Sequence, residues 1–147
     1  MANFQRLLAV GAGALVLATG ISAPAAASHI TAEDSFRFSF TENSNGAVIN
    51  VNNNTMFESA GNVIWRQDPS GGRPGDALYA GDILADGYGI EGRLSTNPER
   101  VASTRGHNSP YSVTVTGNLP EGNTYWLRAC VVRGSFEVCS AAHEVTA

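Results

Sequence analysis

"WLRACVVRGSFEVCSA", residues 126–141, decides the fold. It holds Cys130 and Cys139, the only cysteines of the chain. The pair Gly134-Ser135 suits a two-residue type II′ turn, and this turn sets Cys130 opposite Cys139. Counting outward from it places the cysteines on a non-hydrogen-bonded pair, where Cα atoms approach to about 4.5 Å, within the range that a disulfide spans. The stretch therefore predicts a β-hairpin closed by one disulfide.

Alternation along this hairpin separates two faces. The face expected in the core carries Tyr125, Leu127, Ala129, Val131, Phe136 and Val138. The face expected outside carries Trp126, Arg128, Cys130, Val132, Glu137 and Cys139. A metal site needs more Cys or His ligands, and a redox pair is usually Cys-x-x-Cys. A structural disulfide on the outer face is predicted instead, and its loop of about ten residues contributes roughly 2.5–3 kcal/mol.

Upstream of the hairpin, the chain reads as further short strands with a period of two. In "SFRFSF", residues 35–40, three phenylalanines share one face. Other runs of this kind are 46–52, 62–67, 81–86, 87–96, 100–104 and 111–117, and the Gly- and Pro-rich 68–76 is a loop. Eight or nine strands with turns every 8 to 12 residues and no amphipathic helix predict a single all-β domain over 35–147, a sandwich or a small barrel, and the sandwich is the preferred interpretation.

The first residues predict export. Arg6 precedes an apolar run from Leu7 to about Ile21, and Ala25 and Ala27 form the A-x-A pattern of a cleavage site. Residues 1–27 are therefore expected to be a signal peptide and 28–34 a flexible leader. The run is too short for a membrane span, so no membrane attachment is expected after cleavage. An extracellular location also favours the disulfide.

Length and charge limit the kinds of partner that this domain is expected to bind. Cleavage after residue 27 leaves 147 − 27 = 120 residues, one domain by length. Loss of Arg6 moves the formal charge from −4 to −5, and the chain contains Arg but no Lys. An acidic domain without a basic cluster argues against nucleic acid as a partner.

"LPEGNTYWLRACVV", residues 119–132, resembles the late strands of fibronectin type III domains. There a Leu precedes a Tyr by six residues, as Leu119 precedes Tyr125 here. The resemblance implies an immunoglobulin-like or fibronectin-like sandwich in which the Tyr125 hydroxyl bonds nearby backbone. "VIWRQDPSGG", residues 63–72, is weakly similar to the third strand of immunoglobulin variable domains. The chain departs from that pattern, because no early-strand cysteine is present to bridge the sheets.

Four further motifs, "ADGYG", "GHNSPY", "LPEGN" and "RACVVRGSFEVC", resemble those of small exported actinobacterial proteins of uncharacterised function. The abundance of Ala and Gly and the lack of Lys suit such a GC-rich host. This resemblance implies a fold and a location but no chemistry.

Catalytic candidates are few. Of the three histidines, only His107 lies in a promising loop, "GHNSPY", beside Ser109 and Tyr111. A small extracellular hydrolase using His107 with Ser109 or a nearby acid is one hypothesis. Neighbours in sequence seldom form a catalytic triad, and no Gly-x-Ser-x-Gly elbow is present. The alternative is a surface turn, and a non-enzymatic protein without a cofactor is predicted.

Acidic residues after Trp65 are the only candidate metal ligands. They are Asp68, Asp76, Asp82 and Asp86. "GGRPGDALY" is similar to one calcium-binding nonapeptide repeat, but that repeat binds calcium only when several copies are stacked. A turn, and no metal, is the preferred interpretation.

The leading hypothesis is a secreted binding protein for a saccharide or an extracellular protein. Its candidate binding residues are Trp126, Arg128, His107 and Tyr111. Trp126 is either a ligand contact, or it covers the disulfide or packs against a crossing loop. Two further alternatives are a protease inhibitor presenting Arg100 or Arg105, and a carrier of an apolar small molecule between the sheets.

Overall fold

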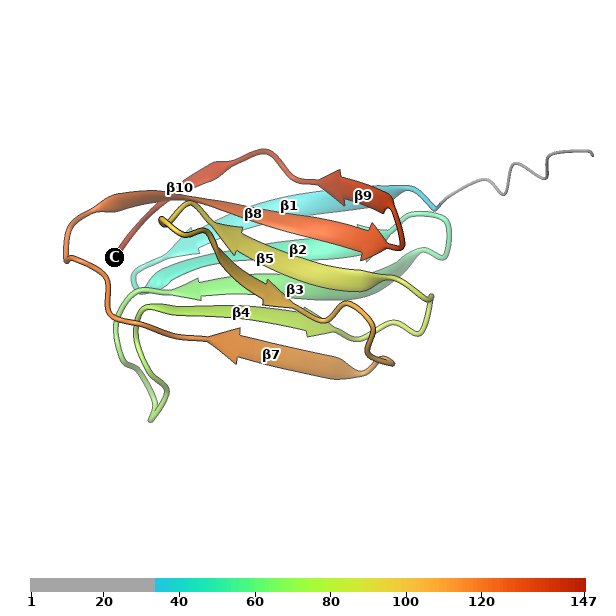
Figure 1. Cartoon of the computed structure of the whole chain (residues 1–147). Helices are drawn as coiled ribbons and strands as arrows, with labels where there is room; N and C mark the ends of the chain where they lie inside the picture. The colour runs from blue at the N-terminus through green and yellow to red at the C-terminus, as the bar shows by residue number, and fades with distance from the viewer. Residues whose placement is uncertain (1–33) are drawn as a thin grey trace, which may run out of the picture. The chain divides into compact units, whose positions relative to one another are not determined.

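The computed structural model describes residues 34–147, and this part of the chain consists of strands and loops without a helix (Figure 1). The predicted signal peptide and residues 28–33 of the predicted leader lie outside the described residues. Ten strands are present. They are β1 Phe36–Asn43, β2 Gly46–Asn53, β3 Glu58–Arg66, β4 Ala77–Asp82, β5 Gly89–Leu94, β6 Arg100–Ser103, β7 Tyr111–Val115, β8 Thr124–Arg133, β9 Phe136–Cys139 and β10 His143–Thr146.

The strands form two antiparallel sheets, which confirms the predicted all-β sandwich (Figure 1). The first sheet has the order β1-β2-β3-β4-β7, and the second has the order β10-β8-β5-β6 with β9 also paired to β8. β9 and β10 follow one another along the same edge of β8, which pairs with β5 on its other edge. No helix of residues 34–147 is long and apolar enough to cross a membrane.

Alternating apolar side chains fill the space between the sheets. Pairs that lie directly opposite share a face, so Phe40 meets Ile49 and Val63 meets Ala80. From the second sheet, Ile90, Leu127 and Val131 point into the same core. The three phenylalanines of β1 pack against this core, as the sequence predicted.

The last hairpin has the predicted register. Arg133 pairs with Phe136 across the turn, and Cys130 pairs with Cys139 in a disulfide with a Cα–Cα distance of 4.0 Å. Leu127, Ala129 and Val131 are buried in the core. The local geometry of a two-residue turn was sufficient to determine which residues face one another.

Two features, β4 and Tyr125, differ from the sequence-based expectations. The strand expected at 81–86 instead runs over Ala77–Asp82, so it begins inside "GGRPGDALY", the motif interpreted as a turn. This strand is buried on both sides, so its pattern does not alternate. Within residues 34–147, no hydrogen bond joins the Tyr125 hydroxyl to backbone. The ring instead packs against the core, and the tyrosine-corner contact is absent there.

The loops gather at two opposite ends of the sandwich. The segments 54–57, 83–88, 104–110 and 134–135 share one end, because β4 ends where β7 begins and β5 begins beside the end of β8. The long loop 67–76 and the segment 116–123 share the other end, where the Asp76 carboxylate accepts a hydrogen bond from the Leu119 amide. The strands run from one end of the sandwich to the other, so they separate the two sets of loops.

Candidate functional site

The first candidate site is a groove on the outer face of the second sheet, named here the Trp126 groove. It has a volume of about 490 Å³ and is lined by Arg93, Ser95, Glu99, Trp126, Arg128 and Ala142. The Trp126 side chain projects outward, as predicted, and is 50% exposed. Ser95 holds the backbone beneath it, since its hydroxyl accepts a hydrogen bond from the Trp126 amide at 2.8 Å. The groove thus combines one accessible indole ring with charged and hydroxyl groups.

A network of ion pairs lies beside this groove. Arg93 donates to Glu91 at 2.6 Å and also to Glu137, while Arg105 donates to Glu91 at 3.0 Å. Burial by itself would raise the pKa of Glu91, but hydrogen bonds from Arg93, Arg105 and Ser103 outweigh it and lower this pKa. These contacts tie β5 to β6 and β9 on the outer face.

Arg128 is an uncompensated positive charge in the groove. It lies directly opposite Arg93 in the β8–β5 pairing. Arg93 is neutralised by two carboxylates, whereas Arg128 forms no ion pair or side-chain hydrogen bond with residues 34–147. An exposed guanidinium beside an exposed indole is therefore available to a ligand.

The disulfide lies on the outer face, as predicted, but Trp126 does not cover it. Trp126 and Cys130 are four residues apart on β8, which corresponds to about 13 Å. Cys130 is fully buried, although it points away from the core. Its strand neighbour Glu91 and the ion pairs around Glu91 cover this part of the face instead. The position of Trp126 does not favour the alternative in which it covers the disulfide.

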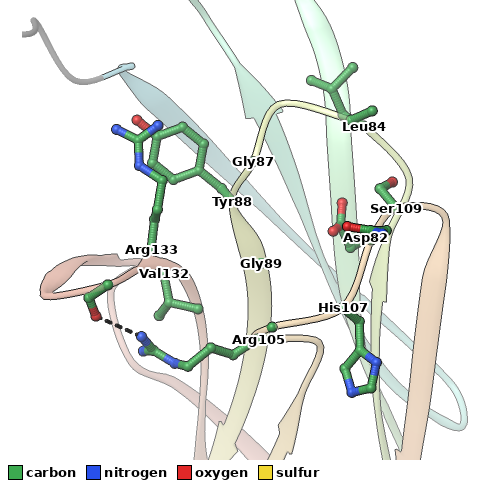
Figure 2. Close-up of a pocket in the computed structure, with 14 residues that line it drawn as sticks. Asp82, Leu84, Gly87, Tyr88, Gly89, Arg105, His107, Ser109, Val132 and Arg133 are labelled. Atoms are coloured by element: carbon green, nitrogen blue, oxygen red, sulfur yellow. Dashed lines mark hydrogen bonds between the residues drawn. The ribbon is translucent and has the colours of Figure 1, made fainter.

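The second candidate site is a pocket of about 750 Å³ at one end of the sandwich, named here the Asp82 pocket (Figure 2). Its walls come from the end of β4, the segments 84–89 and 105–109, and the β8–β9 turn at 132–134. Arg105 closes one side, donating a hydrogen bond of 2.9 Å to the Gly134 carbonyl. Both sheets therefore contribute to this pocket.

Asp82 forms the polar wall of this pocket. Its side chain is 2% exposed, and among the described residues neither its Oδ2 atom nor the buried Ser109 Oγ beside it has a hydrogen-bond partner of good geometry (Figure 2). Burial raises the pKa of Asp82 from 3.8 to about 6; the Ser109 hydroxyl and the Leu84 backbone partly oppose this shift, and the charge of Asp86 adds to it. The carboxylate is thus held at a cost to stability, which is typical of functional groups.

Replacing Asp82 by Asn is expected to stabilise the protein at pH 7.5. The folded chain keeps the Asp82 proton up to about pH 6, whereas the unfolded chain releases it near 3.8. Stability of the wild type therefore falls as the pH rises through this window and stays reduced above it. The shift corresponds to about 3 kcal/mol at most, and solvent in the open pocket lowers the expected gain to about 1–2 kcal/mol.

Urea unfolding of wild type and Asp82→Asn at pH 4.5 and 7.5 measures this effect. The stability gap should be widest at pH 7.5 and clearly smaller at pH 4.5, which lies inside the window where the wild type loses stability. Asp68→Asn, at an exposed aspartate, is the matched control and should change little at either pH. A gap of equal size at both pH values would show that Asp82 titrates normally.

His107 and Ser109 line the same pocket but do not act on one another. The imidazole stacks on the Tyr111 ring, with centroids 3.8 Å apart and planes inclined by 6°. Ser109 Oγ has no hydrogen-bond partner of good geometry among residues 34–147, and it lies beside Asp82, so no Ser–His pair is formed there. His107 and Tyr111 therefore form one exposed pair of stacked rings. This arrangement does not favour a hydrolase in which His107 acts as the base for a Ser109 nucleophile.

The four candidate metal ligands lie at opposite ends of β4. Asp68 and Asp76 belong to the loop before this strand, and Asp82 and Asp86 lie at its end and beyond. A six-residue strand spans about 20 Å, so one ion cannot bind both pairs. The Asp86 carboxylate is moreover engaged by the Tyr88 amide and the Asn53 side chain. The cluster expected from the sequence is not formed.

The remaining candidate residues are held by internal contacts. Arg100 donates to the carbonyls of Asp76 and Gly117, and Arg105 binds Glu91. Neither arginine is presented on an extended loop, which does not favour the protease-inhibitor alternative.

Between the sheets, large side chains such as Trp65 and Leu127 are packed at 1% exposure or less, which does not favour an apolar carrier.

Several residues of the two sites were not identified from the sequence. Glu99 and Ser95 in the Trp126 groove follow β5 in a loop, where alternation carries no information. Tyr88 and Arg133 belong to the Asp82 pocket. Arg133 was within reach of prediction, because it follows Val131 by two residues and must share its face.

Comparisons with known proteins give no match for this chain, whether with protein families, with curated proteins or with solved structures.

Proposed function

We propose that this protein is an exported, non-enzymatic domain of immunoglobulin-like type that binds a saccharide in the Trp126 groove. The observation that carries the proposal is the half-exposed Trp126 ring in a concave, polar surface. An indole ring packs well on the apolar face of a sugar ring, while side-chain donors and acceptors bind its hydroxyls. Arg128, Glu99 and Ser95 supply such groups here.

Rigidity of the surroundings supports this proposal. The disulfide joins β8 to β9, the contacts of Glu91 with Ser103 and Arg105 join β5 to β6 and the segment after it, and the Arg93–Glu137 pair joins β5 to β9. A site whose strands are held in place loses little conformational entropy when a ligand binds. The disulfide also suits an extracellular location, which is part of the proposal.

Replacing Trp126 by Ala should weaken polysaccharide binding at least tenfold, since the stacking surface is lost. Sedimentation of residues 28–147 with insoluble cellulose, chitin and peptidoglycan measures the bound fraction. Phe57→Ala is the matched control, because Phe57 is 92% exposed on a turn remote from the groove. Its binding should equal that of the wild type.

Two results would contradict the saccharide proposal. One is equal binding by wild type and Trp126→Ala, and the other is retention by none of the three polysaccharides. A protein partner that is captured by the wild type and lost with Trp126→Ala would assign the same groove to protein recognition instead.

A further inference from the structure

The Asp82 pocket has features of a second ligand site that is independent of the Trp126 groove. Its volume of about 750 Å³ lies within the usual range of small-molecule sites, roughly 300–1,000 Å³. Its walls mix apolar side chains, among them Leu84 and Val132, with a few polar groups. The polar groups of the lining indicate which kind of ligand the pocket would bind.

Two buried polar atoms share one wall. Asp82 Oδ2 and Ser109 Oγ are both buried, and residues 34–147 supply neither with a hydrogen-bond partner of good geometry. A buried polar atom without a partner is costly and rare, so a ligand donor at this wall would restore a favourable interaction. Because Asp82 carries the only carboxylate of the pocket lining, a positively charged donor fits best.

The opposite wall carries a positive charge. The Arg133 guanidinium lies over the Tyr88 ring, with its Cζ atom 4.0 Å from the ring centroid. No ion pair or side-chain hydrogen bond joins it to another described residue, whereas the neighbouring Arg105 is bound to Glu91. Arg133 is therefore preorganised by the aromatic ring and open to an anion.

We propose that the Asp82 pocket binds a small zwitterion of the α-amino acid class. Its ammonium group lies at Asp82 and Ser109, and its carboxylate lies at Arg133. The apolar walls at Leu84 and Val132 receive an aliphatic side chain. A metal ion would find one carboxylate and nearby guanidinium groups, and a simple anion would leave Asp82 Oδ2 without a donor, so neither fits the pocket as well.

Titration calorimetry with residues 28–147 and L-leucine tests this assignment. Leucinamide keeps the ammonium but lacks the carboxylate, and N-acetyl-leucine keeps the carboxylate but lacks the ammonium. L-leucine should bind most tightly, and each analogue should bind at least tenfold more weakly. Arg133→Gln should bind L-leucine and leucinamide equally, which ties the carboxylate to Arg133.

Asp82→Asn should weaken L-leucine binding at least tenfold, although it is expected to be more stable than the wild type, so the loss does not reflect unfolding. Asp68→Asn and Arg37→Gln are charge-matched controls outside the pocket, and each should bind like the wild type. Absence of L-leucine binding at millimolar concentration would overturn the proposal, as would unchanged affinity in Asp82→Asn. The Trp126→Ala variant should still bind L-leucine, so the two proposals fail separately.

Discussion

Replacing Trp65 by Ala should lower the free energy of unfolding by about 3–5 kcal/mol, because it opens a large cavity in the core. Trp65 is 1% exposed and lies between Ala47 of β2 and Leu78 of β4. Its Nε1 atom also donates a hydrogen bond of 2.8 Å to the Thr146 carbonyl in the other sheet. The variant therefore loses both packing and a contact that joins the two sheets.

Guanidinium unfolding followed by circular dichroism measures this loss. The chain contains two tryptophans, so Trp126→Ala serves as a matched control. Its side chain lies on the surface, and its unfolding free energy should change by less than about 0.5 kcal/mol. Similar losses in both variants would mean that Trp65 is not the main core residue of the first sheet.

Replacing both Cys130 and Cys139 by Ala should lower the free energy of unfolding by about 2.5–3 kcal/mol without changing the fold. The bridge joins residues nine positions apart, and removing it restores chain entropy to the unfolded state. The hairpin keeps its register, because β8 also pairs with β5 along Gly89–Leu94. Alanine suits these positions, since Cys130 is fully buried.

Denaturant unfolding of the double variant and of the reduced wild type measures the contribution of the bridge. Both proteins should lose a similar amount of stability and keep the same far-ultraviolet circular dichroism. A double variant that no longer folds would show that the disulfide determines the hairpin. Free thiols in the intact wild type would mean that the bridge does not form in solution.

Much of the fold was predictable from short-range patterns. The alternating phenylalanines of β1 identified a strand and its buried face, and the turn at Gly134 determined the pairing of Cys130 with Cys139. These features depend on the two-residue period of a strand and on the geometry of a tight turn, which act within about ten residues. β4 was misassigned, because a strand buried on both faces has no alternation.

The candidate sites were only partly predictable. Alternation on β8 correctly placed Trp126 and Arg128 on the outer face. It did not indicate that Arg93 would be neutralised by Glu91 and Glu137, because those contacts come from neighbouring strands. Grouping Asp76 with Asp82 as metal ligands was wrong. The two residues are close in sequence, but β4 lies between them and holds them at opposite ends of the sandwich.

By itself, the sequence determined the faces of β1 and β8, the last hairpin and its disulfide, since each depends on local periodicity and chain geometry. Only the tertiary structure brought Asp82 beside Ser109 and Arg133 opposite them, because these residues lie on loops of different strands. Likewise, Trp65 meets Thr146 across 81 residues only when the two sheets stack. Such contacts follow from the order of the strands and the packing of the sheets, which no short segment encodes.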